Sequence, residues 1–489
     1  MKKKLIVTVA ALSLFLFSGC STVISENTKT EDTQETTDLS FKENDLDSSY
    51  SVNGSVYLNL GNEDIRITKA GTYILEGTLN GSIIIEVSKD EDVRLILNNV
   101  KINADDFAGI YIIEADEVTL TLAEGSVNTI TDSRTHVQID GNDVDALIYS
   151  KADLIFNGSG TLILNSDYSH GIVSKDDLTI TEGTYQIDTA GQGIRGKDSI
   201  KIADGTFEIS SGGDSLKADN EEDGKGYIYI ENGSFTINSQ ADGIYAYSLV
   251  DIEGGEFSIK TVKSSSADSY KAVKSDNKIR INGGSFVIDS DDDSIHSNGS
   301  IVIADGTIDI TSSDDGIHAD GLVEIDGGNI TIDAHEGVEG TYVLINGGTI
   351  AIEASDDGIN AGQKSNLYTP TVEINDGYIT IVMGQGDTDA IDVNGYLYIN
   401  GGTVDITAQF PFDYDKGAEH NGGTIIVNGE ETSEITNQFG GMGGGPFSPG
   451  ENGPFSPGDG EDFPDNTDFP PGGNPGEGGH FPPGEKPKR

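Results

Sequence analysis

The sequence predicts an all-β chain folded as a single right-handed parallel β-helix, and two recurring phrases carry this prediction. The first reads Ser-Asp-Asp-Gly-Ile in its clearest copies, and its glycine slot recurs at Gly316, Gly337 and Gly358, 21 residues apart. The second follows shortly after and alternates apolar and polar residues around a glycine pair, as in residues 325–332. Such a period is typical of solenoids. The short strands leave no room for crossover helices, so each unit is expected to close as one coil upon its neighbour.

The repeat indicates a parallel β-helix over residues 50–436. At roughly 22 to 28 residues per coil, this length gives about 14 to 15 coils in one elongated domain. Asp-Gly and Asn-Gly pairs mark the turns, because Gly and Asn tolerate positive φ. Cys20 is the sole cysteine, so no disulfide forms within the chain and stability must come from the stacking of coils.

The two flanks of this domain differ from it in composition. Residues 1–20 read as a lipoprotein-type signal peptide, with three lysines followed by an apolar run that is too short to be a stop-transfer span. The signal ends in a lipobox-like Phe-Ser-Gly-Cys, where Phe17 departs from the usual Leu, and it predicts lipidation of Cys20. We therefore expect an extracellular protein anchored to the bacterial membrane by lipid alone. Residues 21–49 and the Gly/Pro-rich residues 437–489 are expected to be a disordered linker and a disordered tail.

The charge balance restricts the partners. The chain carries 83 acidic and 29 basic residues, a formal net charge of −54. Such a charge argues against nucleic acid or anionic lipid as a direct partner. We expect a monomer.

Many of these charges are expected to stack in a column. The residue before the slot position is acidic in successive coils, and the residue before that adds further carboxylates. The resulting candidate metal ligands are Asp292, Asp293, Asp314, Asp315, Glu336, Asp356, Asp357 and Asp389. Unit charges one coil apart repel by roughly 1 kcal/mol in water and by about 3 to 4 kcal/mol at a surface-like dielectric.

Three arrangements relieve this repulsion: outward splaying, protonation or a bound cation. Hard carboxylate oxygens suit Ca²⁺, so calcium is the predicted cofactor. The alternative is that one Asp of each pair makes a turn-type hydrogen bond to a backbone N–H.

Several phrases together resemble one family. They occur at residues 71–79 (GTYILEGTL), 93–100 (VRLILNNV), 150–162, 171–178 and 193–200. Their order is similar to that of the clostridial carbohydrate-binding, pectate-lyase-like β-helix family, whose members bind cellulose and polygalacturonate. The resemblance implies calcium-dependent, non-catalytic binding of a polysaccharide, either acidic and pectin-type or cellulosic.

Two other functions stay open. A calcium-dependent pectate-type lyase needs a basic residue near the substrate carbon, and Lys274 and Arg195 each lie two residues after a slot position. These side chains are alternatively outward charges that pair with acidic neighbours. The third possibility is a structural surface adhesin or spacer.

Ligand contacts are sought among aromatic rings, because flat rings pack on pyranose faces. Tyr245 with Tyr247, and Tyr396 with Tyr398, each share one face of a strand by alternation, although lining of the solenoid is an equal alternative. His296 and His318 occupy the same position in adjacent coils and predict either an imidazole stack or a ligand contact. A zinc ligand set is not recognised there.

Overall fold

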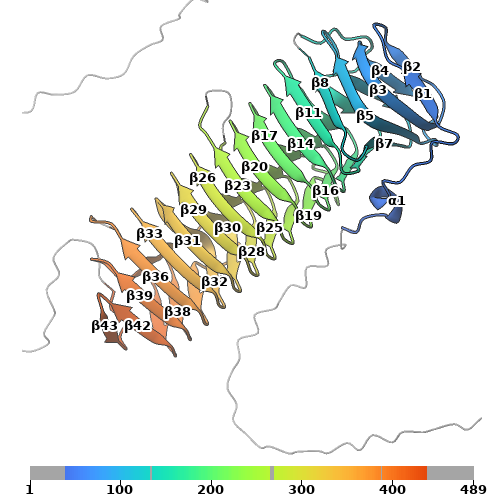
Figure 1. Ribbon diagram of the computed structural model, residues 1–489. Coiled ribbons are helices and arrows are strands. Elements are labelled where there is room, and N and C mark those ends of the chain that lie inside the picture. Colours follow the sequence, from blue (N-terminus) through green and yellow to red (C-terminus); the bar gives the residue numbers. More distant parts are fainter. Residues whose placement is uncertain (1–38, 133–134, 265–268, 387, 438–489) are drawn as a thin grey trace, which may run out of the picture. The chain divides into compact units, whose positions relative to one another are not determined.

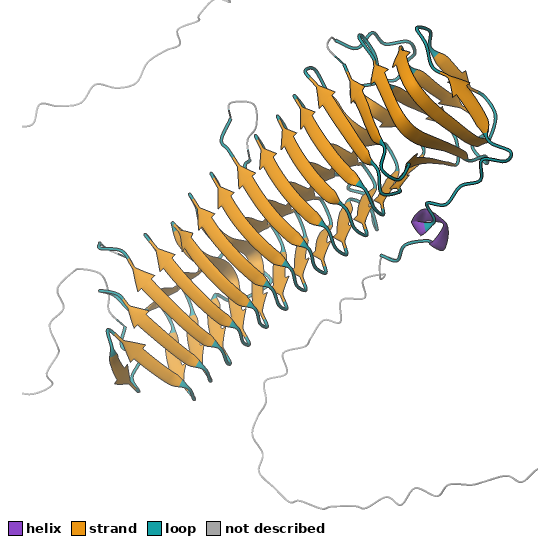
Figure 2. Cartoon of the chain, in the orientation of Figure 1, coloured by secondary structure: helices purple, strands orange, loops and turns teal. Residues whose placement is uncertain are grey.

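The computed structural model describes residues 39–132, 135–264, 269–386 and 388–437, in which the strands repeat in threes. β14 (Thr184–Thr189) pairs in parallel with β11 (Thr161–Ser166) before it and with β17 (Thr206–Ser211) after it. The two strands next to β14 in the chain pair three strands away in the same manner. Each coil therefore contributes one strand to each of three parallel sheets around a common axis (Figures 1 and 2). The predicted parallel β-helix is confirmed.

The first sheet carries the slot position of the repeat. Its strands are β2 (Ile65–Ile67), β4 (Ile83–Glu86), β6 (Ile110–Glu114), β9 (Ala146–Ser150), β12 (His170–Ser174), β15 (Ile194–Gly196), β18 (Leu216–Ala218), β21 (Ile244–Ala246), β24 (Val273–Ser275), β27 (Ile295–Ser297), β34 (Ile359–Ala361), β37 (Ile391–Val393) and β40 (Asp413–Tyr414).

The second sheet follows the first after a short turn in most coils, with longer loops between β18 and β19 and between β34 and β35. Its strands are β1 (Val56–Asn59), β7 (Glu117–Leu122), β10 (Asp153–Asn157), β13 (Asp177–Ile180), β16 (Ser199–Ile202), β19 (Tyr227–Ile230), β22 (Leu249–Ile252), β25 (Lys278–Ile281), β28 (Ser300–Ile303), β35 (Thr371–Ile374), β38 (Tyr396–Ile399) and β41 (Gly417–His420).

The third sheet contains the longest regular run of strands. Besides β11, β14 and β17, its strands are β8 (Val127–Thr131), β20 (Ser234–Ser239), β23 (Glu256–Thr261), β26 (Ser285–Ser290), β29 (Thr307–Ser312), β31 (Asn329–Ala334), β33 (Thr349–Ala354), β36 (Tyr378–Met383), β39 (Thr403–Thr407), β42 (Thr424–Val427) and β43 (Glu430–Thr432). Long strands β3 (Gly71–Asn80) and β5 (Val93–Asn103) bend from the second sheet into the third, and β30 (Asp315–Ile325) and β32 (Glu336–Ile345) bend from the first into the second. Among the described strands, only the β42–β43 pairing is antiparallel.

Stacked side chains of one kind fill the interior. Ile, Val and Leu of successive coils lie in register and are fully buried, as the alternating phrases predict. Five aromatic rings continue one such stack through β14, β17, β20, β23 and β26, with centroids 4.9, 4.6, 4.8 and 4.5 Å apart and nearly parallel planes. The rings are those of Tyr185, Phe207, Phe235, Phe257 and Phe286. Each coil thus depends on its neighbours for its core.

An N-terminal segment, residues 39–49, lies against the second sheet, and we call it the strap. It contains the short helix α1 (Glu43–Leu46) and lies within the region that composition predicts to be a disordered linker. Its backbone carbonyls accept hydrogen bonds from side chains of the sheet: Asn157 donates to Asp45 at 3.2 Å, and Lys201 donates to Ser40 at 3.0 Å. The described part of this region therefore packs along the β-helix.

The remaining flanking predictions, including the signal peptide, Cys20 and residues 438–489, lie outside the described residues. Within the described residues we find no helix whose length and apolar character would let it cross a membrane.

Candidate functional site

The acidic ladder of the first sheet is first of all a set of backbone acceptors. The carboxylate of Asp214 accepts the N–H of Asp242, one coil further on, at 3.1 Å, and Asp242 accepts the N–H of Lys271 at 2.9 Å. Asp293 accepts from Asp315 at 3.3 Å, and Asp357 accepts from Asp389 at 3.2 Å, in the same manner. The alternative of a backbone-bonding Asp is thus realised, with the bond joining successive coils.

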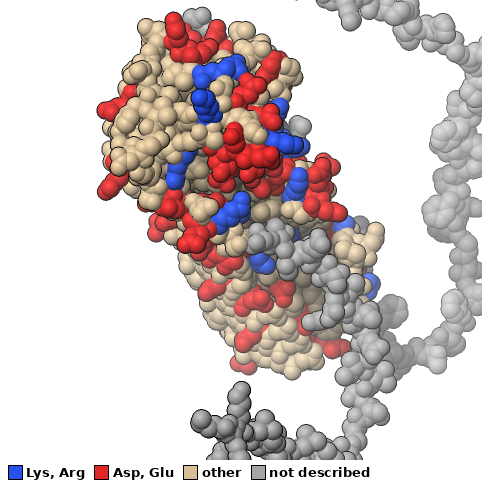
Figure 3. Space-filling view, turned by 90° about the vertical axis from the view of Figure 1, so that its right-hand side faces the viewer, with Lys and Arg blue, Asp and Glu red and all other residues tan. Residues whose placement is uncertain are grey.

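Basic side chains interleave with the central part of this ladder. Lys217 lies 2.8 Å from Asp214, and Lys274 lies 3.2 Å from Asp242. Lys271 bridges Asp292 at 2.7 Å and Asp293 at 3.0 Å. The expected column of like charges is therefore interrupted, because the ammonium groups of Lys217, Lys271 and Lys274 lie within it. Figure 3 shows Lys and Arg interspersed among Asp and Glu over one face of the molecule.

The two predicted histidines continue this compensation. Their rings lie 4.7 Å apart and edge to face. The Nδ1 of His296 lies 2.7 Å from Asp293, and the Nδ1 of His318 lies 2.9 Å from Asp315. Burial disfavours the charged ring of His318, but its hydrogen bonds with Asp293 and Asp315 prevail and raise its pKa to about 10. These contacts make His318 a cation of the ladder.

The C-terminal part of the ladder has far less compensation. Lys364 lies 2.6 Å from Glu339, whereas Glu336 and Asp357 form no ion pair with any described residue. Burial, reinforced by neighbouring carboxylates, raises the pKa of Glu336 and of Asp357 to about 7. The same two causes raise the pKa of Asp392 to about 6. Carboxyl groups without basic partners, which burial and mutual repulsion drive toward the neutral form, therefore concentrate in this part of the ladder.

The raised pKa of Asp357 predicts how the stability of the fold depends on pH. A carboxyl whose pKa is raised in the folded state stabilises the fold while protonated, and that contribution is lost as pH rises from about 4 through about 7. Asp357→Asn keeps an acceptor for the N–H of Asp389 but cannot ionise. In the absence of calcium, the unfolding free energy of the wild type should fall between about pH 5 and pH 8. In the variant this fall should be smaller by on the order of 1–2 kcal/mol, a magnitude that allows for solvent screening.

Denaturant unfolding followed by circular dichroism at both pH values measures this difference. Asp309→Asn, at an exposed position of β29, is the matched control and should keep the wild-type dependence. Equal pH dependence in Asp357→Asn and wild type would contradict the prediction.

The predicted metal ligands are only partly brought together. Oxygens of Asp292, Asp293 and Asp314 lie within 4.8 Å of one another, although the Lys271 ammonium already contacts two of them. Asp315 forms a second group with His318 and Glu339. Within the described residues, no such group includes Glu336, Asp356, Asp357 or Asp389. The sequence analysis missed a further group, Asp153, Asp176 and Asp177, whose signal is the Lys-Asp pair repeated at Lys175 and Lys197.

The basic residues of the lyase alternative are held by carboxylates. Arg195 makes a two-pronged contact with Asp219, with both oxygens at 2.8 Å. Besides its contact with Asp242, Lys274 lies 4.9 Å from the centre of the Tyr245 ring. The alternative that these side chains pair with acidic neighbours therefore describes both, and no specific observation favours catalysis by them.

The four predicted tyrosines have different surroundings. Tyr245 is sandwiched between Lys217 and Lys274, and its hydroxyl donates to Asp276 at 2.8 Å. Tyr247 is half-buried just after β21. Tyr396 and Tyr398, in contrast, stack side by side on the outside of the second sheet, with ring centroids 6.0 Å apart and planes inclined by 16°. We call this pair the tyrosine platform.

Polar and charged groups border the tyrosine platform. Tyr396 is 38 % exposed, and the Lys416 ammonium lies 5.6 Å from its ring centre. Glu373 and Glu419 pair in register with Tyr398 in the preceding and following coils. A flat apolar surface bordered by hydrogen-bonding and charged groups has the character of a sugar-binding site.

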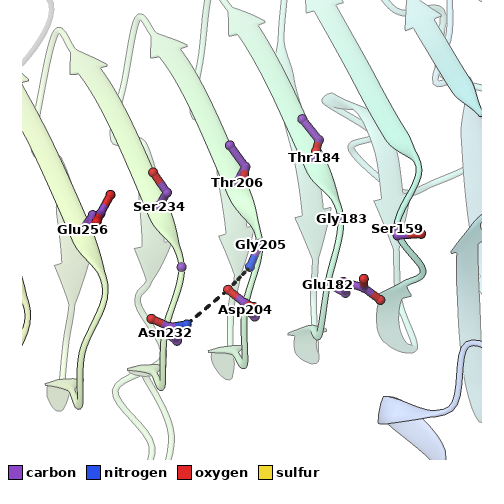
Figure 4. Close-up of a pocket in the computed structure, with 11 residues that line it drawn as sticks. Ser159, Glu182, Gly183, Thr184, Asp204, Gly205, Thr206, Asn232, Ser234 and Glu256 are labelled. Carbon is purple, nitrogen blue, oxygen red and sulfur yellow. Dashed lines mark hydrogen bonds between the residues drawn. The ribbon is translucent and has the colours of Figure 1, made fainter. Parts of the chain in front are cut away.

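A polar groove, which the sequence analysis did not identify, follows the start of the third sheet. One hollow of about 430 Å³ lies over β14, β17 and β20 and is bordered by Glu182, Asp204 and Asn232 (Figure 4). A second hollow of about 430 Å³ lies in the same register further along, at Asp305 and Thr307. Glycines line both hollows. In the first, Gly233 has φ +138°, and a Cβ there would lie 2.9 Å from the ring of Phe235. The groove thus arises where the turns need glycine.

Comparison with known proteins finds a family model, a relative and a solved structure that this chain is similar to. Residues 61–316 and 315–440 match a model whose family is described as carbohydrate-binding domain-containing protein. A protein of the same description from Acetivibrio thermocellus is 35% identical over 261 residues, which are 53% of this chain and 90% of the relative. A similar solved structure is that of the polysaccharide lyase-like protein from C. thermocellum, as a gadolinium derivative. The two are 28% identical in sequence, and the match covers 49% of this chain and 87% of the solved chain with a TM-score of 0.38.

Proposed function

Because the chain belongs to the family of carbohydrate-binding domain-containing proteins, we propose that it binds polysaccharide without cleaving it and uses the tyrosine platform as its sugar contact. The stacked pair on one face of β38, in which Tyr396 is exposed and Tyr398 half-buried, is the observation that carries this assignment. Aromatic rings bury the apolar face of a pyranose, while neighbouring polar groups bond its hydroxyls.

The proposed ligand is a uronate-rich, pectin-type polymer, and calcium is the proposed bridge. A chain of charge −54 repels a polyanion. Carboxylates without ion pairs, such as Glu336 and Asp357, together with those of the polymer, would supply the oxygen ligands that Ca²⁺ prefers. Near the platform, the ammonium of Lys416 is a further positive group for a uronate.

The location that suits this function is the outside of the cell. We propose that lipidation at Cys20 anchors the protein to the bacterial membrane, so that the β-helix meets polysaccharide in the surroundings. A structural adhesin would share this location but would retain no glycan.

Removal of the tyrosine platform tests the sugar contact. In the double variant Tyr396→Ala and Tyr398→Ala, we expect at least a tenfold loss of affinity for oligogalacturonate in the presence of Ca²⁺, since both flat apolar surfaces that a pyranose face would bury are removed. Isothermal titration calorimetry measures this loss.

Tyr378→Ala is the matched control, because Tyr378 is 47 % exposed but starts a strand of the third sheet. Its affinity should stay at the wild-type value. Unchanged affinity in the platform variant, with wild-type binding present, would contradict the assignment of the platform.

A further inference from the structure

A second aromatic surface lies on the face of the second sheet that carries the tyrosine platform. Tyr342, where β32 has bent into the second sheet, pairs in register with Thr371, which pairs in turn with Tyr396 of the platform. Tyr342 and Tyr396 both lie on the outer face, because the residue after each is fully buried. The ring of Tyr368 packs beside that of Tyr342, with centroids 5.9 Å apart and planes inclined by 39°. We call Tyr342 and Tyr368 the second aromatic pair.

The insert between β34 and β35, residues 362–370, presents Tyr368 to solvent and is anchored at both ends. Tyr368 is 38 % exposed, as much as Tyr396. The hydroxyl of the buried Thr341 accepts two backbone N–H groups near the start of the insert, at 3.0 and 2.8 Å. At the other end, the carbonyl of Pro370 accepts the N–H of Tyr396 at 3.1 Å. These hydrogen bonds fix the insert before any ligand binds, which lowers the entropy cost of binding.

The distance between the two aromatic surfaces matches the repeat of a linear polysaccharide. One strand, β35, separates β32 from β38, so the two surfaces lie two coils, or about 10 Å, apart along the axis. A pyranose unit of a linear chain is about as long as one coil spacing. Sugars two units apart on one chain would therefore meet the two surfaces, and the unit between them would face β35.

Glu373 of β35 supplies a hydrogen-bond acceptor between the two surfaces. It pairs in register with Tyr398 of the platform, and its carboxylate accepts a hydrogen bond from the hydroxyl of Tyr342. A carboxylate has lone pairs for several donors, so a hydroxyl of the middle sugar can share it. Two flat apolar surfaces with a polar group between them have the character of an extended sugar-binding site.

The strap shows how a chain lies along this face. Successive pairs in register lead from Tyr229 of β19 to Tyr398 of β38, so both occupy one column of the outer face. Phe41 of the strap packs on Tyr229 with ring centroids 5.9 Å apart, and Lys201 donates to the carbonyl of Ser40 at 3.0 Å. Further side chains donate to strap carbonyls as far as β5. The face thus holds an extended chain along the axis through ring contacts and hydrogen-bond donors, and a polysaccharide offers groups for both.

We propose that the second aromatic pair is a further sugar subsite and that the polysaccharide lies along the β-helix axis across β32, β35 and β38. This inference rests on the proposed function, since it extends the contact that the tyrosine platform makes. The ligand is a linear pyranose polymer, of which at least about three successive sugars are needed to reach both surfaces. Affinity should therefore rise with chain length, from a disaccharide that covers one surface to a longer chain that covers both.

Calorimetry with oligogalacturonates of two lengths in the presence of Ca²⁺ tests the subsite. Wild type should bind tetragalacturonate at least tenfold more tightly than digalacturonate, because the longer chain buries a second pyranose face. In Tyr368→Ala, the affinity for tetragalacturonate should fall at least fivefold, while the affinity for digalacturonate should stay at the wild-type value.

Two variants of the same insert are the controls. Leu367→Ala changes a neighbouring residue that is 85 % exposed, and Tyr368→Phe keeps the ring, so both should retain the wild-type affinity for tetragalacturonate. Unchanged affinity in Tyr368→Ala would overturn the subsite, and so would an equal loss for both ligands.

The platform variant separates this inference from the proposed function, because Tyr396→Ala with Tyr398→Ala should weaken the binding of both ligands. A loss in that variant with none in Tyr368→Ala would overturn the subsite alone. Failure of wild type to bind either oligosaccharide would overturn the proposed function as well.

Discussion

Retention of this protein on immobilised polygalacturonate is expected to disappear when EDTA removes calcium. The chain carries a net charge of −54, and the polymer carries one carboxylate per sugar. Without a bridging cation, both surfaces repel each other over a Debye length of about 8 Å at physiological salt. We expect at least a tenfold fall in affinity, measured on an affinity column or by calorimetry with oligogalacturonate.

Controls separate bridging from folding. Unfolding should remain cooperative in EDTA, because the core of stacked Ile and Phe side chains needs no metal. Added Ca²⁺ should restore binding, whereas the same ionic strength supplied as NaCl should not. Retention that EDTA leaves unchanged would contradict calcium bridging, and the platform alone would then carry the proposed binding.

The fold could be predicted because the same residue pattern recurs at a regular spacing in successive coils. Gly316 and Gly337 mark one position in β30 and β32, Gly358 directly precedes β34, and the three strands pair in register. Stacking of identical positions then follows from geometry, and the backbone-bonding role of the ladder Asp residues was among the alternatives.

The compensation of the ladder could not be predicted with the same certainty. Lys217 and Lys274 occupy the same position of the repeat, whereas Lys271 lies just before a slot position, and inserts of unequal length separate their coils. Which ammonium meets which carboxylate depends on side-chain direction, which the repeat does not fix. Lys271 even occupies the acidic position itself, yet it contacts Asp292 and Asp293 of the next coil.

The strap shows a different limit. It lies at the end of residues 21–49, whose composition, rich in Thr, Glu and Asp, is typical of a linker, and it contributes few buried apolar side chains. It is held instead through its backbone carbonyls, by Arg94, Asn157 and Thr181 among others. Hydrogen bonds to backbone carbonyls do not depend on which side chains a segment carries. Its composition therefore cannot predict that the segment packs on the β-helix.

Truncation of one ring in the aromatic stack is expected to have the largest effect on stability. Phe235 is 1% exposed and lies between Phe207 and Phe257, with centroids 4.6 and 4.8 Å away. Phe235→Ala removes the transfer free energy of the ring and leaves a cavity that the parallel strands cannot close, since hydrogen bonds on both sides fix their spacing. We expect a loss of about 3–5 kcal/mol in unfolding free energy, measured by urea denaturation.

Two further variants make this result interpretable. Val287→Ala changes an exposed residue, 56 % accessible, on β26 of the same sheet and should cost less than about 0.5 kcal/mol. Phe235→Leu refills part of the cavity and should fall between Ala and wild type. Each coil's core is completed by its neighbours, so weakened packing at β20 should uncouple the coils before it from those after it. In the Ala variant the two parts should then unfold at different urea concentrations, seen as a shoulder in the denaturation curve. A loss below about 1 kcal/mol in Phe235→Ala would show that neighbouring coils close the gap, and that the ring stack is not what couples them.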